Sequence, residues 1–311
     1  MKNIAVLFIL IFNLLSCMNT KQDNAKSTSV PEDFFEGKDL LMEKAIYAAN
    51  ISEIERLIKA EGFNANTRGS HLKSKYSEKP SEYTYLGYAV LVGEIKAAEK
   101  LLELGADVNS VSIDKGIYTN IGMACTSKNK DMINLLLKYK VNLNPPLSSS
   151  PFVALLIGDT DRNLFDLLLT NGADVNHKEY IGGGGPLIAA LYVEKVEYMN
   201  YFLDKGADPS QINYVGNSFA YMIQSELDEG RLVGQSLKDY QKIKDRLVND
   251  FNVKFPLKNE YRRGLEESIQ RSESLSAEDK KLLGNDEVER IELFKKSLIT
   301  GKSPGGAPLD N

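Results

Sequence analysis

The chain has 311 residues, of which 42% are hydrophobic and 26% are charged, a balance that is typical of globular proteins and excludes wholesale disorder. Its formal net charge is -5 and no cluster of Lys and Arg stands out, which argues against a site for nucleic acid. The apolar content is sufficient for a substantial core.

The first sixteen residues have the pattern of a signal peptide. Lys2 supplies a positive charge, and residues 4–15 form an apolar stretch that only Asn13 interrupts. A membrane-spanning helix needs about 20 apolar residues, whereas this sequence turns polar from Asn19 onward. We therefore expect residues 1–16 to be removed and not kept as a membrane span.

The apolar stretch ends in Leu14, Leu15, Ser16 and Cys17, which resemble the lipobox of bacterial lipoproteins. The resemblance implies cleavage before Cys17 and acyl chains on its side chain, where each buried methylene contributes about 0.8 kcal/mol to membrane binding. The alternative is an ordinary secretory signal in which Cys17 is incidental. Met18 follows the cysteine in place of an aspartate. In an organism with two membranes, the family's sorting rule then implies the periplasmic face of the outer membrane.

Residues 17–38 are predicted to form a flexible tether. The part from Asn19 to about Glu32 is rich in Lys, Ser and Asn, with too little apolar surface to offset the entropy lost on ordering. With Cys17 lipidated, Cys125 has no partner for an internal disulfide. Cys125 lies in an apolar helical pattern, which favours a small buried side chain over a reactive thiol.

A pattern recurs along residues 39–256. Each copy contains an apolar helix with an alanine, a polar break, a second helix with paired leucines, and then Gly-Ala-Asp. The clearest copies place their glycines at Gly105, Gly172 and Gly206, which lie 67 and 34 residues apart. A degenerate copy at residues 140–144 divides the longer interval into two periods. The first helices carry alanines at a similar spacing, namely Ala45, Ala89, Ala124, Ala154, Ala189 and Ala220.

This pattern resembles the ankyrin repeat, a unit of about 33 residues in which a turn precedes two antiparallel helices. The resemblance implies an all-α ankyrin-repeat solenoid of about six helix-turn-helix units. The glycine is expected to take a left-handed backbone after the second helix, and the Asp and Asn to bond nearby amides. No copy keeps the histidine of the family's Thr-Pro-Leu-His opening, so its hydrogen bonds must be replaced or missing. The best-preserved copy reads Gly-Pro-Leu-Ile-Ala at residues 185–189.

Two repeats are longer than the period. The loop of residues 67–84 is about ten residues longer than the period allows. In the last unit, about residues 226–236 separate the two helices, and the second helix is predicted at residues 238–250. Long insertions usually map to one face, often the binding face. Tyrosine is enriched in interfaces, and the partner-binding candidates are therefore the tyrosines of the long loop and the inter-repeat turns, Tyr76, Tyr83, Tyr118, Tyr180 and Tyr214. The alternative is that turn tyrosines pack on their own loops.

The repeat pattern stops near Phe255. Residues 257–300 are predicted to form a helical C-terminal cap on the open end of the repeats, with helices at about residues 259–271, 277–283 and 287–299. Ser276 and Asp279 have the spacing of a capping box. Residues 301–311, rich in Gly and Pro, are expected to be disordered.

Catalytic motifs are not found: there is no Gly-x-Ser-x-Gly, no His-Glu-x-x-His and no Cys/His cluster. His71 and His177 fall in loops about three repeats apart, which argues against a shared metal site. Arg262, Glu266 and Glu267 remain as candidates for chemistry, but their pattern is typical of a solvated helix face. We predict no enzyme activity, catalytic residue, metal, cofactor or small-molecule substrate.

Together these features predict a membrane-anchored, protein-binding lipoprotein of the cell envelope that acts through its concave face and inter-repeat turns. It would contact the membrane through the lipid anchor alone and would not bind nucleic acid. One alternative is an immunity protein that binds and neutralises a secreted toxin, such as a type VI phospholipase effector. The other is a host-directed or adhesive surface protein, which requires the anchor to face outward.

Overall fold

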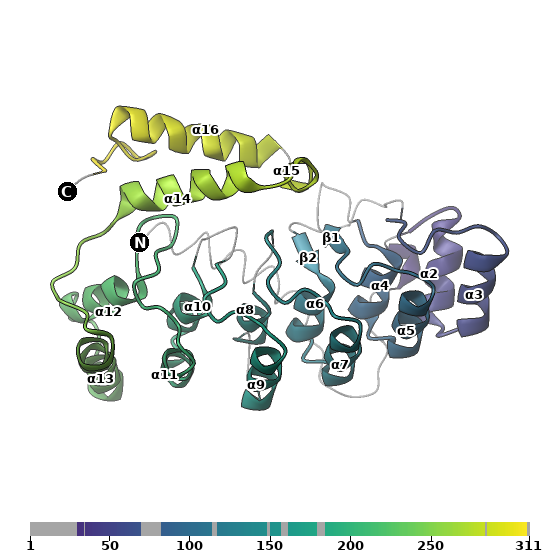
Figure 1. Ribbon diagram of the computed structural model, residues 1–311, viewed down its shortest axis with the longest axis horizontal. Helices are drawn as coiled ribbons and strands as arrows, with labels where there is room; N and C mark the ends of the chain where they lie inside the picture. Colours follow the sequence, from purple (N-terminus) through teal and green to yellow (C-terminus); the bar gives the residue numbers. More distant parts are fainter. Residues whose placement is uncertain are drawn as a thin grey trace. The chain divides into compact units, whose positions relative to one another are not determined.

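The computed structural model describes residues 30–33, 35–69, 82–113, 117–147, 150–156, 161–178, 184–283 and 285–309. Contacts divide the chain into two compact units, Met1–Asn142 and Leu143–Asn311. Both units consist mainly of paired helices (Figure 1). Within the described residues no helix has the length and apolar character needed to span a bilayer. The predicted signal peptide and Cys17 lie outside these residues.

The described residues form six helix pairs, as the repeat pattern predicts. The first unit contains α2 (Asp39–Tyr47) with α3 (Ile51–Lys59), α4 (Tyr85–Val92) with α5 (Ile95–Glu103), and α6 (Asn120–Thr126) with α7 (Lys130–Lys138). The second contains α8 (Pro151–Leu156) with α9 (Arg162–Thr170), α10 (Pro186–Tyr192) with α11 (Val196–Asp204), and α12 (Phe219–Asp228) with α13 (Gly234–Phe251). Most of these helices are too short to be stable alone, so packing must hold them.

Local sequence sets the helix ends and the buried faces. Thr84 and Asn129 cap α4 and α7, each accepting a hydrogen bond from an amide three residues later. The paired leucines Leu101 and Leu102 are buried, as are Phe165 and Phe202 in the second unit, whose rings lie 5.6 Å apart edge to face. These apolar side chains fill the space between helix layers.

The alanine positions predicted for the later repeats are wrong in register. In every repeat from α4 onward, the fifth residue of the first helix is fully buried. The residues at this position are Ala89, Ala124, Leu155, Ala190 and Ile223. Ala154, Ala189 and Ala220 lie one or three residues before these positions. Larger side chains take the alanine position in two repeats, so alanine spacing alone does not give the register.

The tether is shorter than predicted. A 3-10 helix, η1 (Pro31–Asp33), precedes Phe35, which is 1% exposed and packs edge to face on Tyr88 at 5.2 Å. A Cβ at Gly69 would lie 2.2 Å from the Phe35 ring, so glycine is required for this packing. The polar composition of residues 19–32 gave no sign that Phe35, a few residues later, packs on the repeats.

The last repeat also differs from its prediction. α12 ends at Asp228 and α13 begins at Gly234, so the connection is shorter than residues 226–236. α13 is the longest helix described, with 18 residues, and Asn252 ends it with a left-handed φ of 56°.

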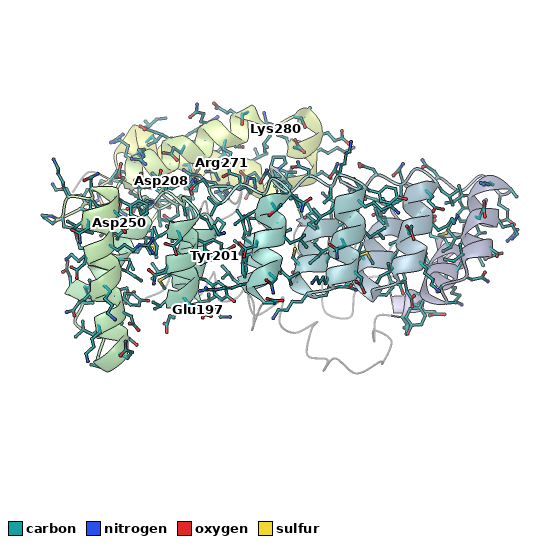
Figure 2. All side chains as sticks on the ribbon, turned by 60° about the horizontal axis from the view of Figure 1, so that its bottom comes forward. Glu197, Tyr201, Asp208, Asp250, Arg271 and Lys280 are labelled. Atoms are coloured by element: carbon teal, nitrogen blue, oxygen red, sulfur yellow. The ribbon has the colours of Figure 1, made fainter. Side chains whose placement is uncertain are left out.

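Polar contacts join the second helices α9 and α11 of two neighbouring repeats. The Tyr201 hydroxyl on α11 donates to Asp166 on α9 at 2.9 Å, and Lys205 pairs with the same carboxylate at 2.8 Å. Tyr201 and Glu197 lie along α11, away from the turn that holds Asp208 (Figure 2). Burial and Asp166 raise the pKa of Tyr201, which keeps its hydroxyl protonated as the donor.

The predicted C-terminal helices are present as α14 (Tyr261–Ser274), α15 (Ala277–Leu283) and α16 (Asn285–Thr300). The Asp279 amide donates to Ser276 Oγ at 3.0 Å, as expected for an N-cap. The expected disorder of the tail is wrong for residues 301–309. Leu309 is 5% exposed and joins Leu265, Ile291 and Phe294 in an apolar cluster that holds the tail in place.

Candidate protein-binding surface

The turns between repeats are built as the sequence predicts. Gly105, Gly172 and Gly206 have φ values of 92°, 94° and 88°, a left-handed conformation that costs glycine little. The aspartate two residues after each glycine then accepts a hydrogen bond from the amide two residues further on, at 2.8 to 2.9 Å. Each turn therefore has the same backbone course.

Asparagine side chains join successive turns to one another. Asn66 donates through Nδ2 to Gly105 O at 3.1 Å, and its Oδ1 accepts from the Asp107 amide at 2.6 Å. In the second unit, the same pair of bonds joins Asn144 to the turn of Gly172 and Asn176 to the turn of Gly206. We call this arrangement the asparagine ladder. It fixes the spacing of the turns in each unit.

One turn of the first unit extends into a β-hairpin. β1 (Val111–Ile113) pairs antiparallel with β2 (Ile117–Thr119), and Glu82 adds an antiparallel bridge to Ile113. Ser112 and Thr119 are buried beneath the hairpin, whereas Tyr118 on β2 is half-buried. Val111, Ile113 and Ile117 are likewise half-buried, which leaves the hairpin with a partly exposed apolar surface.

A polar network below this hairpin takes the place of the missing family histidine. In the opening Thr84-Tyr85-Leu86-Gly87, Gly87 stands where the Thr-Pro-Leu-His pattern has its histidine. Thr84 Oγ1 lies 3.1 Å from Ser110 Oγ. Asn120 donates to Val108 O at 3.0 Å. Ser112 Oγ and Asn120 Oδ1 are buried without a hydrogen-bond partner among the described residues. The replacement is thus partial.

The corresponding turn of the second unit, residues 211–218, is held by its own side chains. Ile212 bridges to Ser218, and Asn213 Oδ1 accepts from the amides of Val215 and Asn217 at 3.1 and 3.0 Å. Helix α14 lies on this turn, since the Glu260 amide donates to Gly216 O at 2.9 Å. The predicted helical cap therefore packs on an inter-repeat turn.

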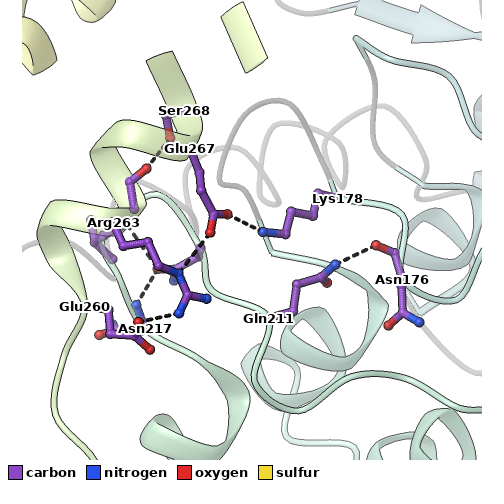
Figure 3. A network of polar contacts seen from close by, with 11 residues as sticks. Asn176, Lys178, Gln211, Asn217, Glu260, Arg263, Glu267 and Ser268 are labelled. Atoms are coloured by element: carbon purple, nitrogen blue, oxygen red, sulfur yellow. Dashed lines mark hydrogen bonds and ion pairs between the residues drawn. The ribbon is translucent and has the colours of Figure 1, made fainter. Parts of the chain in front are cut away.

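An ion pair connects α14 to the preceding turn. Lys178 Nζ lies 2.6 Å from Glu267 Oε2, and Arg263 donates to the other oxygen at 3.0 Å (Figure 3). Partial burial would raise the pKa of Glu267, but the ion pairs with Lys178 and Arg263 outweigh it and hold this pKa below its usual value. The sequence made Glu267 a candidate for chemistry, but its carboxylate forms the ion pairs that connect α14 to this turn.

The five predicted partner-binding tyrosines have different outcomes. Tyr76 and Tyr180 lie outside the described residues, as does the lipidation site Cys17. Tyr83 is 5% exposed, so little of its side chain is available to a partner. Tyr214 stacks on Phe294 of α16, with ring centroids 6.4 Å apart, and so contacts the C-terminal helices of its own chain. Tyr118 remains at the surface of the β-hairpin.

The histidine and cysteine side chains of the described residues do not form a metal or nucleophile site. Within the described residues, no three His, Cys, Asp or Glu side chains gather as a metal site would require. His71 lies outside those residues. His177 is half-buried, its Nε2 donates to Pro145 O at 2.8 Å, and burial lowers its pKa. Cys125 is buried, which raises the pKa of its thiol and disfavours the reactive thiolate.

Sequence reasoning missed the contact surface of α14. Lys178 and Gly264 were not selected, although a glycine inside a predicted helix is a signal of close packing. A Cβ at Gly264 would lie 2.6 Å from Gly216 N, so the two backbones approach too closely for any side chain. Gly264 carried this signal, but Gly216, the residue that it meets, lies 48 residues earlier, and no local pattern identifies Gly216 as its partner.

The architecture is similar to solved ankyrin-repeat structures. The ankyrin repeat domain of Bcl-3, a unique member of the IkappaB protein family, is 19% identical, with a TM-score of 0.53 over 68% of this chain and 87% of that chain. The human ASB11 ankyrin repeat domain is 20% identical, with a TM-score of 0.46 over 78% of this chain and 96% of that chain. No protein-family profile matches the sequence. The fold is an all-α ankyrin-repeat solenoid.

Proposed function

We propose that this ankyrin-repeat chain is a protein-binding module without catalytic activity, anchored to a membrane by acyl chains on Cys17. The observation that carries the proposal is the asparagine ladder. Asn66, Asn144 and Asn176 bind the next turn by the same two hydrogen bonds, so side chains on successive turns are held at fixed spacing. A preorganised row of this kind loses little conformational entropy when a partner binds.

Within the first unit, the hairpin β1–β2 is the surface that best fits a partner. Val111, Ile113, Ile117 and Tyr118 keep part of their side chains exposed there. Interfaces typically combine apolar contact area with a tyrosine that retains a polar group. We place the binding site at this hairpin.

A capture experiment tests this site. A soluble form that begins near Asn19, and so lacks Cys17, is used as bait in an extract of the producing organism, and bound proteins are identified by mass spectrometry. One protein should be enriched, and Tyr118→Ala should weaken its binding at least tenfold, since hot-spot truncations cost about 2 kcal/mol or more. Tyr47→Ala is the matched control because Tyr47 ends α2 and does not lie in an inter-repeat turn. Undiminished capture by Tyr118→Ala would exclude the hairpin as the site.

The identity of the captured protein separates the possible roles. A secreted toxin, such as a type VI phospholipase effector, would make the chain an immunity protein. A host surface protein would favour a host-directed or adhesive role. Met18 after the lipidated cysteine favours the periplasmic face of the outer membrane, and protease treatment of intact cells tests that location, since a periplasmic protein should be protected.

A further inference from the structure

The C-terminal helices cover turns that are equivalent to the binding surface proposed above. Gly264 in α14 lies directly on the turn of residues 213–217, because a Cβ at Gly264 would be 2.6 Å from Gly216 N and 2.8 Å from Tyr214 O. Gly216 is equally constrained, since its own Cβ would lie 2.1 Å from the Glu260 carbonyl carbon. The contact is thus a close approach of two backbones at paired glycines.

Polar groups of the turns recognise α14 along its length. Asn259 donates to Val215 O and the Glu260 amide to Gly216 O, both at 2.9 Å. About two helical turns after Glu260, Glu267 pairs with Lys178 of the preceding inter-repeat turn (Figure 3). In α14, Gly264 therefore faces the backbone of one turn, and Glu267, three positions later, faces the lysine of the other.

The C-terminal helices have an apolar core of their own. Leu265, Ile291, Phe294 and Leu309 form it, with Tyr261, Ile269 and Leu298 packed around it. Among the residues that the structure describes, Tyr214 is the one member of the repeats that packs against this cluster. The remaining described contacts with the turns are mostly polar, and the side chains of Lys178 and Glu267 keep 22% and 32% of their surface exposed. Such an interface is typical of segments that separate and rejoin.

We propose that α14 is an internal mimic of a partner helix, which occupies the turns of residues 176–178 and 211–217 until a partner displaces it. The partner helix would carry a small residue against Gly216 and an acidic residue three positions later against Lys178. This inference rests on the proposed function, because it specifies what a protein partner must present to the second unit.

The test uses the full mature chain and a labelled peptide of residues 259–275. In the chain, Gly264→Val should release α14, which faster amide hydrogen exchange in α14 than in the wild type would report. Gly305→Val is the control, since its Cβ meets only Ser303 Oγ, at an ordinary 3.8 Å. Fluorescence anisotropy should show the peptide binding Gly264→Val at least tenfold more tightly than the wild type or the control.

A charge exchange makes the test specific. Adding Lys178→Glu to the Gly264→Val chain should weaken binding of the original peptide and restore binding of a Glu267→Lys peptide. Unchanged exchange in α14 of Gly264→Val would overturn the proposal, as would a released α14 with no binding of the peptide. The peptide assay needs no natural partner, so its failure is distinguishable from failure of the capture experiment.

Discussion

Glu43 is a carboxylate in an apolar environment. It lies in α2, is fully buried, and neither carboxylate oxygen has a hydrogen-bond partner among the described residues. Burial, with a smaller contribution from Asp39, raises its pKa well above the usual value. The folded state therefore keeps the Glu43 proton to a higher pH than the unfolded chain, which releases it above about pH 4.5. Its contribution to stability must fall as the pH rises through that range.

Glu43→Met should therefore stabilise the chain at pH 7 by about 1–3 kcal/mol, because it removes an unsatisfied buried polar group. The gain should shrink as the pH falls toward 4.5, where the unfolded state also keeps the proton. Thermal unfolding at both pH values measures this difference. Glu36→Met, at an exposed position, is the control and should show no such pH-dependent gain. A destabilised Glu43→Met chain at pH 7 would contradict this account.

Asn176 shows how a single side chain supports the row of turns. Asn176→Ala removes the bonds to Gly206 O and to the Asp208 amide, and should cost about 1–3 kcal/mol at a typical net value per hydrogen bond. Urea unfolding checks the loss. Asn249→Ala, at an exposed position of α13, should not destabilise the chain. An equal effect of both substitutions would argue against the ladder as a source of stability.

At the scale of elements, the C-terminal helices depend on their own apolar cluster. Phe294→Ala removes the ring that packs with Leu265 and Tyr214, and should destabilise these helices by about 3–5 kcal/mol. Hydrogen exchange should then accelerate in α14 and α16 but not in α10 and α11, whose contacts are with each other and with neighbouring repeats. Ile299→Ala on the same helix is the control, since Ile299 is 86% exposed.

At the scale of the whole molecule, the proposed lipid anchor on Cys17 is the feature with the largest expected effect. Cys17→Ala removes the proposed acylation site. We expect the wild-type chain in the membrane fraction and Cys17→Ala in the soluble fraction. Cys125→Ala should leave the distribution unchanged, because that side chain is buried in α6. Retention of Cys17→Ala in membranes would exclude lipidation as the anchor.

The sequence by itself was sufficient to predict the repeats and their turns. Gly105, Gly172 and Gly206 could be assigned a left-handed backbone, and Asp107 an amide contact, because each depends on neighbours a few residues away. The helix pairs followed from the apolar spacing for the same reason. Only the tertiary structure decided where the C-terminal helices lie, that Phe35 is buried, and that Tyr214 stacks on Phe294. Gly216 meets Gly264 across 48 residues and Tyr214 meets Phe294 across 80, and contacts at such separations leave no periodic trace in the sequence.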